Sequence, residues 1–433
     1  MTKIKNENRR KEAYKKLMKR KRIARKVAGS VAKRRRSEAR FKAYGIFALA
    51  VSFIFLGVLL FSIFSKGYTA FTQTQIELSV TYSPELVEKE NYRKIFKNAI
   101  YSQFPEADSR SEKRLLSYLF SKGAPYRIQQ YYEDNEIALG QKINIWVPAS
   151  SDVDMYMKGR ISESTEESLR KLKDRQINWI KQLDEADSLK KSFNWDFFSS
   201  ADSRDPELAG IAGAFMGSVF VVISCMLLAL PLGILTAIYL EEFAPKNKIT
   251  EIIEVNISNL AAVPSIVFGL LGLTIYLQFF GIPRSAPLAG GLTLALMALP
   301  VIVIATRTSI AAIPQSIRDG AAALGASKVQ TTLHHVLPLA VPGIMTGTIL
   351  SISRVLGETA PLLMIGMVAF VADIPDGFLS PATAMPVQVY LWSDSPEMGF
   401  IEKTSAAIMV LLALLISANA LAIYLRKKFE IRW

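Results

Sequence analysis

The sequence predicts an α-helical integral membrane protein with six transmembrane helices and an α+β domain inserted outside the membrane. Half of the 433 residues are hydrophobic, although one long segment is polar. Six apolar runs are each about 20 residues or longer, the length needed to cross a hydrocarbon core of about 30 Å. A soluble protein with buried helices would rarely contain six such runs. The predicted spans are 43–64, 212–240, 256–280, 288–312, 341–370 and 404–425.

The positive charge of the chain is confined to a basic tail. The formal net charge is +14, and residues 1–42 contain 19 Lys and Arg against three Glu. The remainder carries 33 basic and 35 acidic residues. A basic tail can bind nucleic acid, but this one adjoins the first span. There it favours a cytoplasmic N-terminus and contact with anionic lipid. We therefore expect membrane lipids as partners and no nucleic acid.

The first span, 43–64, is predicted to be a signal anchor. More than 40 residues precede it, its apolar core is long, and no A-x-A-like site follows, unlike a cleavable signal peptide. The second span contains Cys225, the single cysteine of the sequence. No intramolecular disulfide is therefore possible, and we interpret Cys225 as a packing residue.

The distribution of charged residues between the spans predicts the orientation. A cytoplasmic N-terminus places the segment 65–208 and the acidic loop 371–403 outside the membrane. The segments 241–255 and 313–340 and the C-terminus then lie inside, and they contain most of the basic residues of the short loops. This arrangement satisfies the positive-inside rule. We expect both termini to be cytoplasmic.

The polar segment 65–208 is predicted to fold as a small α+β domain. Apolar and polar residues alternate in two strand-like stretches, and three others have helical periodicity. The predicted strands are 74–82 and 141–149, and the predicted helices are 83–99, 111–132 and 164–191. Pro84 stands at a favourable helix start. The apolar side of the last helix would consist of Leu169, Leu172, Ile177, Ile180 and Leu183. We identify no metal, nucleotide or catalytic constellation in this segment.

The loop 313–340 has a pattern typical of a docking element. Pro314 closes the fourth span, and Asp319, Gly320 and Ala321 begin a run of small residues that ends at Gly325. Small side chains let a short helix lie close to another protein, Gly325 permits the turn that ends it, and Asp319 suits a helix start. The adjacent His334 and His335 would point to different faces of a helix, so we expect no metal site. The sequence has no G-x-x-x-x-G-K-[ST] phosphate loop, and ATP hydrolysis is expected on another subunit.

The helix after this loop carries two charges, Arg354 and Glu358, in the stretch SRVLGETAP. Residues at i and i+4 share one helix face, and this position falls near the middle of the predicted span. A charge at such a depth costs about 2.5–3.5 kcal/mol on insertion scales and marks a functional candidate. Arginine binds oxyanions such as phosphate bidentately. Glu358 would hold Arg354 or accept a hydrogen bond from a protonated oxyanion, and Pro361 would bend the helix. The alternative is a pair that neutralises itself in a helix contact.

A third charge, Arg307, lies late in the fourth span. It would either line a path together with Arg354 or extend to the cytoplasmic interface.

The loop resembles the EAA loop of ABC-importer permeases, E-A-A-x-x-x-G-x9-I-x-L-P, which inserts a coupling helix into the cytoplasmic ATPase. Asp319 replaces the Glu, Gly320 replaces the first Ala, and His335 replaces the Ile. The resemblance implies that Asp319, Gly320, Ala321 and Gly325 contact an ATPase.

Residues 209–433 resemble the PstA-like permeases of phosphate transporters through PGIMTGTIL and SRVLGETAPLL. The resemblance implies a type I ABC-importer permease fold in a bacterial inner membrane. It also implies a phosphate path with Arg354, Glu358 and Thr359, which lie in the matching motif. Ile304 replaces the family's usual arginine after LPxIV, so that role would pass to Arg307, one turn away. The implied partners are a PstC-like permease, a PstB-like ATPase dimer that holds the ATP, and a PstS-like external phosphate-binding protein. The chain itself would contain no cofactor, no metal and no catalytic residue.

Three other functions are compatible with parts of this pattern. A permease for sulfate, molybdate or phosphonate would share the loop, whereas the GETAP helix favours phosphate. A membrane sensor would place a signalling module after the last span, where about eight residues follow Leu425. An integral-membrane enzyme would need more nucleophile and base candidates than one Cys and two adjacent His.

Overall fold

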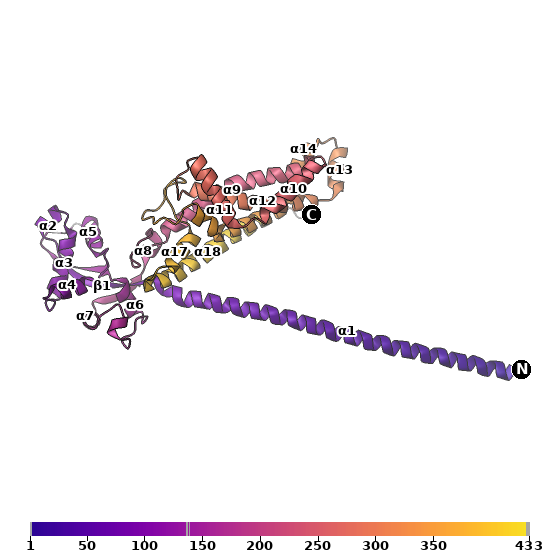
Figure 1. The fold of residues 1–433 in the computed structure, drawn as a ribbon, viewed down its shortest axis with the longest axis horizontal. Coiled ribbons are helices and arrows are strands. Elements are labelled where there is room, and N and C mark those ends of the chain that lie inside the picture. The colour runs from indigo at the N-terminus through magenta and orange to yellow at the C-terminus, as the bar shows by residue number, and fades with distance from the viewer. Residues whose placement is uncertain (1, 136, 138, 430–433) are drawn as a thin grey trace. The chain divides into compact units, whose positions relative to one another are not determined.

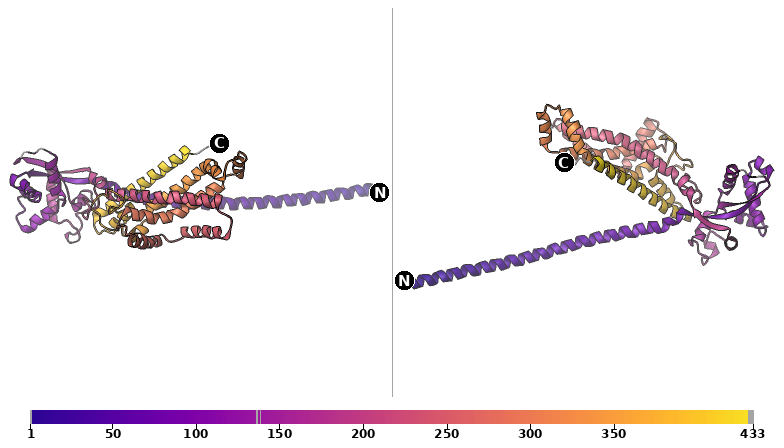
Figure 2. Two further views of the ribbon diagram at one scale, coloured as in Figure 1. Left: turned by 90° about the horizontal axis from the view of Figure 1, so that it is seen from above. Right: turned by 180° about the vertical axis from the view of Figure 1, so that it is seen from behind.

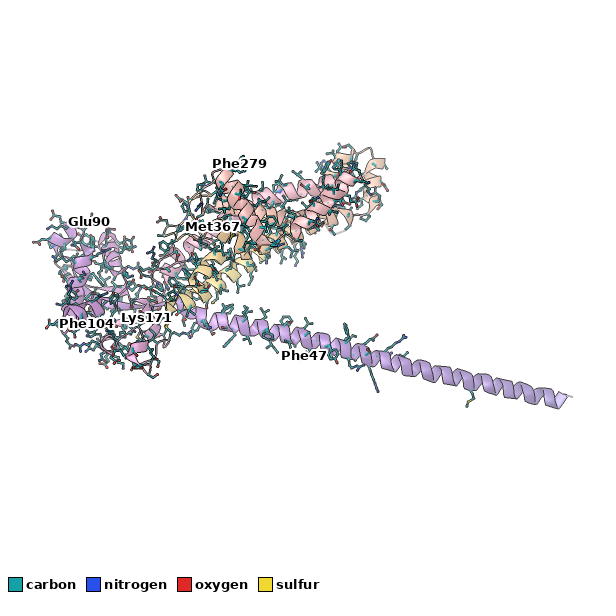
Figure 3. The ribbon with its side chains drawn as sticks, in the orientation of Figure 1. Phe47, Glu90, Phe104, Lys171, Phe279 and Met367 are labelled. Atoms are coloured by element: carbon teal, nitrogen blue, oxygen red, sulfur yellow. The ribbon has the colours of Figure 1, made fainter. Side chains whose placement is uncertain are left out.

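The computed structural model describes residues 2–135, 137 and 139–429, without the side chains of residues 2–17, 19–30, 32, 33 and 429. The chain divides into two units, residues 1–62 and residues 63–433. The first unit belongs to one long helix, α1 (Thr2–Gly67) (Figure 1). Its apolar part, which includes Phe47 (Figure 3), exposes its side chains as a helix surrounded by lipid would. Most basic side chains of the tail 1–42 lie outside the described set, so their contact with lipid stays a prediction.

The segment after α1 contains a three-stranded antiparallel sheet. The central strand β1 (Thr72–Thr81) pairs with β2 (Lys142–Pro148) on one side and β3 (Leu189–Phe193) on the other. Ile76, Leu78 and Val80 alternate along β1 and are fully buried, because successive side chains of a strand point to opposite faces. The sheet thus provides one apolar face for helices.

Short helices pack on this sheet and complete a core of their own. They are α2 (Pro84–Glu88), α3 (Tyr92–Gln103), α4 (Arg110–Ser117), α5 (Ala124–Asp134), α6 (Ser151–Met157) and α7 (Asp174–Glu185). The following helix α8 (Trp195–Ser199) instead buries Phe197 in a second core that includes Trp392 and Phe400. Two 3₁₀ turns, Tyr68–Phe71 and Glu167–Leu169, accompany them. Phe104 (Figure 3) meets Trp179 of α7 edge to face, with ring centroids 6.2 Å apart. The core is therefore aromatic as well as aliphatic.

The two strands predicted in this segment are present, but two of the predicted helices are divided. The expected helix 83–99 is interrupted at Glu90, where φ is +50° (Figure 3), and Asn91 caps α3 by accepting a hydrogen bond from the Lys94 backbone. The expected helix 111–132 becomes α4 and α5. The apolar periodicity of the sequence continues across both interruptions and therefore does not reveal them. The helices are divided by the local conformation of the backbone.

The predicted helix 164–191 is wrong at both ends. Only α7 is α-helical, and the last residues form β3, which pairs with β1. Leu169 is 78% exposed, whereas Leu172, Ile177, Ile180 and Leu183 are buried as predicted. A strand gains its hydrogen bonds from a distant partner, here β1, and helical periodicity in the sequence does not reveal such a partner.

Four long helices form the membrane-type bundle, which Figure 2 shows from above and from behind. They are α9 (Ala212–Ile238), α12 (Pro287–Ala311), α15 (Leu337–Gly357) and α18 (Met398–Phe429). Helix α12 packs against both α9 and α15, and α15 also packs against α18. A side chain at Gly291 would lie 2.3 Å from the Cβ of Ser224. Glycine thus permits the close approach of α9 and α12, as small residues do in membrane helix packing.

Two of the six predicted spans are not continuous helices as expected. The described residues contain five helices long and apolar enough to cross a membrane, or six if one bent pair counts as a span. That pair, α10 (Lys248–Ala261) and Ser265–Phe279, replaces the run 256–280 and bends by 100°. Its second part comprises α11 (Ser265–Gly272) and a π-helical turn. Pro264 stands at the bend, where it removes a backbone donor. The run 341–370 is replaced by Lys328–Gly357, which begins and ends earlier.

The remaining elements are short and connect these helices. They are α13 (Gln315–Ala323), α14 (Lys328–Gln330), α16 (Ala360–Met364), α17 (Met385–Ser393) and π-helical turns at Tyr239–Phe243 and Thr331–Val336.

A buried polar network joins α6, beside the sheet, to the first turns of α18. The Lys158 ammonium lies 2.7 Å from carboxylate oxygens of both Asp154 and Glu402 and donates a hydrogen bond to the Thr72 carbonyl. The next residue of α18, Lys403, is buried and donates to the Ala209 carbonyl. Buried charges require such partners, so these contacts fix the sheet-containing segment on the end of α18.

Candidate functional site

Arg354 lies in the last turn of α15 and is exposed, whereas Glu358 is half-buried. Neither side chain has an ion pair or hydrogen bond within the part of the chain that the structure describes. Arg354 occupies a favourable place on its helix, because a cation near a helix C-terminus gains about 0.3–1 kcal/mol from the helix dipole. Its guanidinium nevertheless keeps all of its donors free, which allows it to bind an anion.

The predicted common helix face of Arg354 and Glu358 is wrong. Helix α15 ends at Gly357, and Glu358 has an extended backbone with φ −85° and ψ 121°. Arg354 therefore lies at a helix end and not in the middle of a span. Glycine is a poor helix former, and Pro361 occurs within the first two residues of α16, where its missing N–H costs nothing. The sequence predicted a bend at Pro361, whereas the helix is interrupted completely between Gly357 and Ala360.

Thr359 begins the short helix after this break. Its carbonyl accepts a hydrogen bond from the Leu363 backbone at 3.0 Å, while its side chain makes no capping bond. Thr359, Glu358 and Arg354 are therefore brought to one interruption between α15 and α16. They lie there as three separate polar groups.

The interruption between α15 and α16 lies close to the other broken helix. Helix α16 packs against α11, the second half of the bent pair. A side chain at Gly269 of α11 would come within 2.8 Å of the Pro361 Cα. Met367, just beyond α16, is fully buried in the same core (Figure 3). Broken helices at membrane depth occur where they are buried in protein or line a polar cavity.

Arg307 has a different environment from Arg354. Its guanidinium lies 2.8 Å from Glu254 of α10 and 3.3 Å from Glu241, which follows α9. No contact in the described chain joins it to Arg354 or Glu358. Two carboxylates already compensate its charge, so an anion would have to compete with them. Sequence reasoning missed both partners, although acidic residues near the ends of neighbouring apolar runs indicated that such pairs were possible.

The predicted docking loop folds as helix α13 and a tight turn. Gly325 follows the helix with φ +87°, a conformation that favours glycine. Its N–H donates to the Ala322 carbonyl, and the next N–H, of Ala326, donates to the Ala321 carbonyl. These two bonds form a Schellman motif, the common glycine-dependent end of a helix. The prediction that Gly325 ends a short helix is confirmed.

Two details of the loop differ from the sequence prediction. Asp319 is the fifth residue of α13 and not at its start, because the helix begins at Gln315 after Pro314. Asp319 instead accepts a hydrogen bond from the Gln315 side chain. Asp319 and Gly320 are exposed, whereas Ala321 is buried. Ala321 therefore holds the loop against its own protein, and the exposed positions remain open to a partner.

Three exposed apolar side chains, which sequence reasoning did not single out, occupy this loop. Leu324 is 90% exposed, and Val329 and Leu333 are about half exposed. Large apolar residues grouped on a surface mark interaction sites. The only available signal was that each is apolar within an otherwise polar loop. We refer to Leu324, Val329 and Leu333 as the apolar loop tip.

Arg318 fastens α13 to the bundle. Its guanidinium donates to Glu242 at 2.7 Å and to the carbonyls of Ile310 and Ile313 at 3.0 and 2.8 Å. The adjacent Glu241 binds Arg307 of α12. A displacement of α13 would therefore be transmitted directly to the ends of α9 and α12.

Comparison with known proteins agrees with this arrangement. Residues 229–431 match the family described as binding-protein-dependent transport system inner membrane component. Residues 28–167 match a domain of unknown function, DUF3333.

Relatives of known name include three permeases. The chain is 34% identical to the phosphate transport system permease protein PstA of Mycobacterium leprae, over 51% of this chain and 72% of the relative. It is 32% identical to the PstA of Haemophilus influenzae, over 46% and 70%. It is 33% identical to the probable ABC transporter permease protein YqgI of Bacillus subtilis, over 43% and 60%.

A solved structure of the MetNI methionine ABC transporter in an inward-facing conformation aligns with a TM-score of 0.41 and 16% identity. The alignment covers 51% of this chain and 96% of that one. The chain belongs to the PstA family of ABC-importer permease proteins, within the binding-protein-dependent transport system inner membrane components.

Proposed function

We propose that this chain is the permease subunit of an ATP-driven importer of inorganic phosphate. It forms the path together with a second permease, is not itself an enzyme, and relies on a separate ATPase subunit. The observation that carries the proposal is Arg354 at the end of a broken helix, unpaired within the described part of the chain, together with relatives named as phosphate permeases. Arg354 attracts the anion, and Glu358 and Thr359 accept or donate hydrogen bonds beside it. A conducting site must attract the ion but also release it, and one free arginine is suited to that balance.

The exposed loop supplies the coupling to the ATPase. The apolar loop tip enters a cleft on the ATPase, with Asp319, Gly320 and Gly325 at the contact and Ala321 behind it. Closure of an ATP-bound dimer then moves α13, and Arg318 passes the movement through Glu242 to α9. Arg307 stabilises the same ends through Glu241 and Glu254. For Arg307 to contact the anion in the path, these ion pairs must open.

The topology that fits this role has six spans, with the bent pair counted as one. The protein is a multi-pass protein of the bacterial inner membrane, and both termini face the cytoplasm. The α+β domain, residues 65–208 inserted after the first span, lies outside. The expected partners are a PstC-like permease, a PstB-like ATPase dimer, a PstS-like binding protein and anionic lipids at the basic tail.

The direct test is uptake of labelled phosphate into membrane vesicles that contain all subunits. We expect uptake that depends on ATP and on this chain and that excess unlabelled phosphate suppresses. Sulfate, molybdate and phosphonate serve as competitors. Preferential uptake of one of these anions would replace phosphate as the substrate, and ATP-dependent uptake without this chain would contradict the permease role.

Leu324→Asp is expected to uncouple the ATPase. Leu324 is almost fully exposed, so the change leaves the fold intact but places a charge in an apolar contact. Central apolar anchors at interfaces are worth about 2 kcal/mol or more, which corresponds to a loss of ATPase affinity of more than about tenfold. Co-purification of the ATPase and uptake would both fall. Leu324→Met, which keeps an apolar side chain, should retain both, and equal behaviour of the two variants would refute the docking role.

A further inference from the structure

A basic groove of about 830 Å³ lies on the α+β segment, between α3, α4 and the chain as far as Pro125. Six basic side chains line this basic groove together with a single carboxylate, Asp108. The basic residues are Arg93, Lys97, Arg110, Lys113, Arg114 and Lys122. None of the transport roles described above uses it.

On each of two helices, α3 and α4, the basic side chains share one face. Arg93 and Lys97 are one turn apart on α3, so they share a face. Arg110, Lys113 and Arg114 have the i, i+3, i+4 spacing that places them on one face of α4. The rings of Phe96 and Phe120, which also line the basic groove, meet edge to face at 5.6 Å. The basic groove is therefore lined by aromatic rings and by basic side chains from two helices.

The concentration of positive charge contrasts with the rest of the segment. Residues 72–208 contain 20 Lys and Arg and 23 Asp and Glu, so the segment as a whole is slightly acidic. Elsewhere in it, basic side chains such as Lys158 and Lys181 have carboxylate partners. In the basic groove, Arg93, Lys97 and Arg110 have no hydrogen-bond or ion-pair partner among the described residues. Clustering unpaired like charges is unfavourable unless an anion compensates them.

The other three cations are held in place by neighbours. Lys113 lies over the Tyr101 ring, with its nitrogen 5.4 Å from the ring centroid, and Arg114 lies over Tyr118 at 5.8 Å. Lys122 forms an ion pair with Asp205 at 2.6 Å. Cation–π contacts keep the charge while they restrain the side chain. The basic groove therefore combines free donors with restrained ones, as a preformed anion site does.

We propose that the basic groove binds a small multivalent oxyanion of the short-polyphosphate type, at a site separate from the transport path. Arginine forks bind phosphate oxygens bidentately, and cations on two helices match an anion with several charged groups. Asp108 lines the basic groove and Asp205 pairs with Lys122, so six cations still exceed these carboxylates by four charges, which a single phosphate ion does not balance. The cavity has the size of small-molecule sites, about 300–1,000 Å³. This concave form favours a small ligand over the flat surface of an acidic protein.

The test measures binding of inorganic triphosphate to the full chain in detergent or nanodiscs by calorimetry. We expect saturable binding with one site, tighter than the binding of orthophosphate and weaker at high salt. Arg93→Gln combined with Arg110→Gln should weaken it at least about tenfold, because charge-assisted hydrogen bonds are lost from both helices.

The control removes two exposed charges from the same part of the chain. The positions of Lys89→Gln and Lys94→Gln lie outside the basic groove, so this double variant should leave triphosphate binding unchanged. Absence of saturable binding would overturn the proposal, and so would an equal loss in both double variants or binding of orthophosphate as tight as that of triphosphate. Binding of only an acidic protein at this surface would overturn it as well.

Discussion

Arg354→Gln is expected to lower phosphate uptake by about tenfold or more. The exposed guanidinium at the end of α15 has no internal partner among the described side chains, so its removal eliminates attraction for the anion and breaks no internal bond. A hydrogen bond to a charged group contributes about 1.5–3 kcal/mol, which corresponds to this factor or more. The measurement is the initial rate of labelled phosphate uptake into vesicles with matched amounts of protein.

Assembly and specificity controls separate this effect from misfolding. Co-purification of the second permease and the ATPase should be unchanged in Arg354→Gln. Arg426→Gln removes a partly exposed arginine, near the end of α18, whose only described contact is a hydrogen bond to Thr346, and should transport normally. Glu358→Gln is also expected to reduce uptake sharply, because it replaces the carboxylate near Arg354 with a neutral amide, which is a weaker acceptor for a protonated oxyanion. Normal uptake in both Arg354→Gln and Glu358→Gln would remove these residues from the path.

Lys158→Met is expected to destabilise the junction between the sheet-containing segment and α18 by about 3 kcal/mol or more. The Lys158 side chain is 5% exposed and lies between Asp154 and Glu402. Removal of one partner from a buried ionic group leaves an uncompensated charge, which typically costs about 3–5 kcal/mol. Thermal unfolding of the purified chain should shift to lower temperature. Protease cleavage between the segment and the bundle should become faster.

A second substitution distinguishes lost charge compensation from lost packing. Adding Glu402→Gln to Lys158→Met removes one of the two carboxylates that lost their cation, so part of the stability should return. Lys94→Met, at an exposed position, should have little effect. If the double variant is no more stable than Lys158→Met, the charge explanation is wrong and packing accounts for the loss.

The sequence predicted most elements whose signal is local. The apolar runs gave long helices, the alternation in 74–82 and 141–149 gave β1 and β2, and Gly325 gave the end of α13. Each of these depends on the periodicity of side chains or on the permitted φ of one residue. The exposed charge at Arg354 was found for the same reason, because a charged residue beside an apolar run is visible in the sequence.

What the sequence missed depends on partners that are distant in the chain. β3 forms because its backbone pairs with that of β1. The carboxylates around Arg307 belong to residues 53 and 66 positions away in the chain. The helix predicted to carry both Arg354 and Glu358 is broken near Gly357 and Pro361. The part after the break, α16, packs against α11, which is distant in the sequence. Apolar composition alone cannot distinguish one straight helix from two that meet at an angle.

The sequence by itself determined that this is a membrane permease with a short loop helix that ends at Gly325 and a charged motif, because hydropathy, small-residue spacing and motif residues are properties of consecutive positions. Only the tertiary structure decided that Arg307 is paired while Arg354 has no partner among the described residues, and that six cations share one groove. These differences arise because the energy of a charge depends on which oppositely charged groups the fold brings within a few ångströms of it.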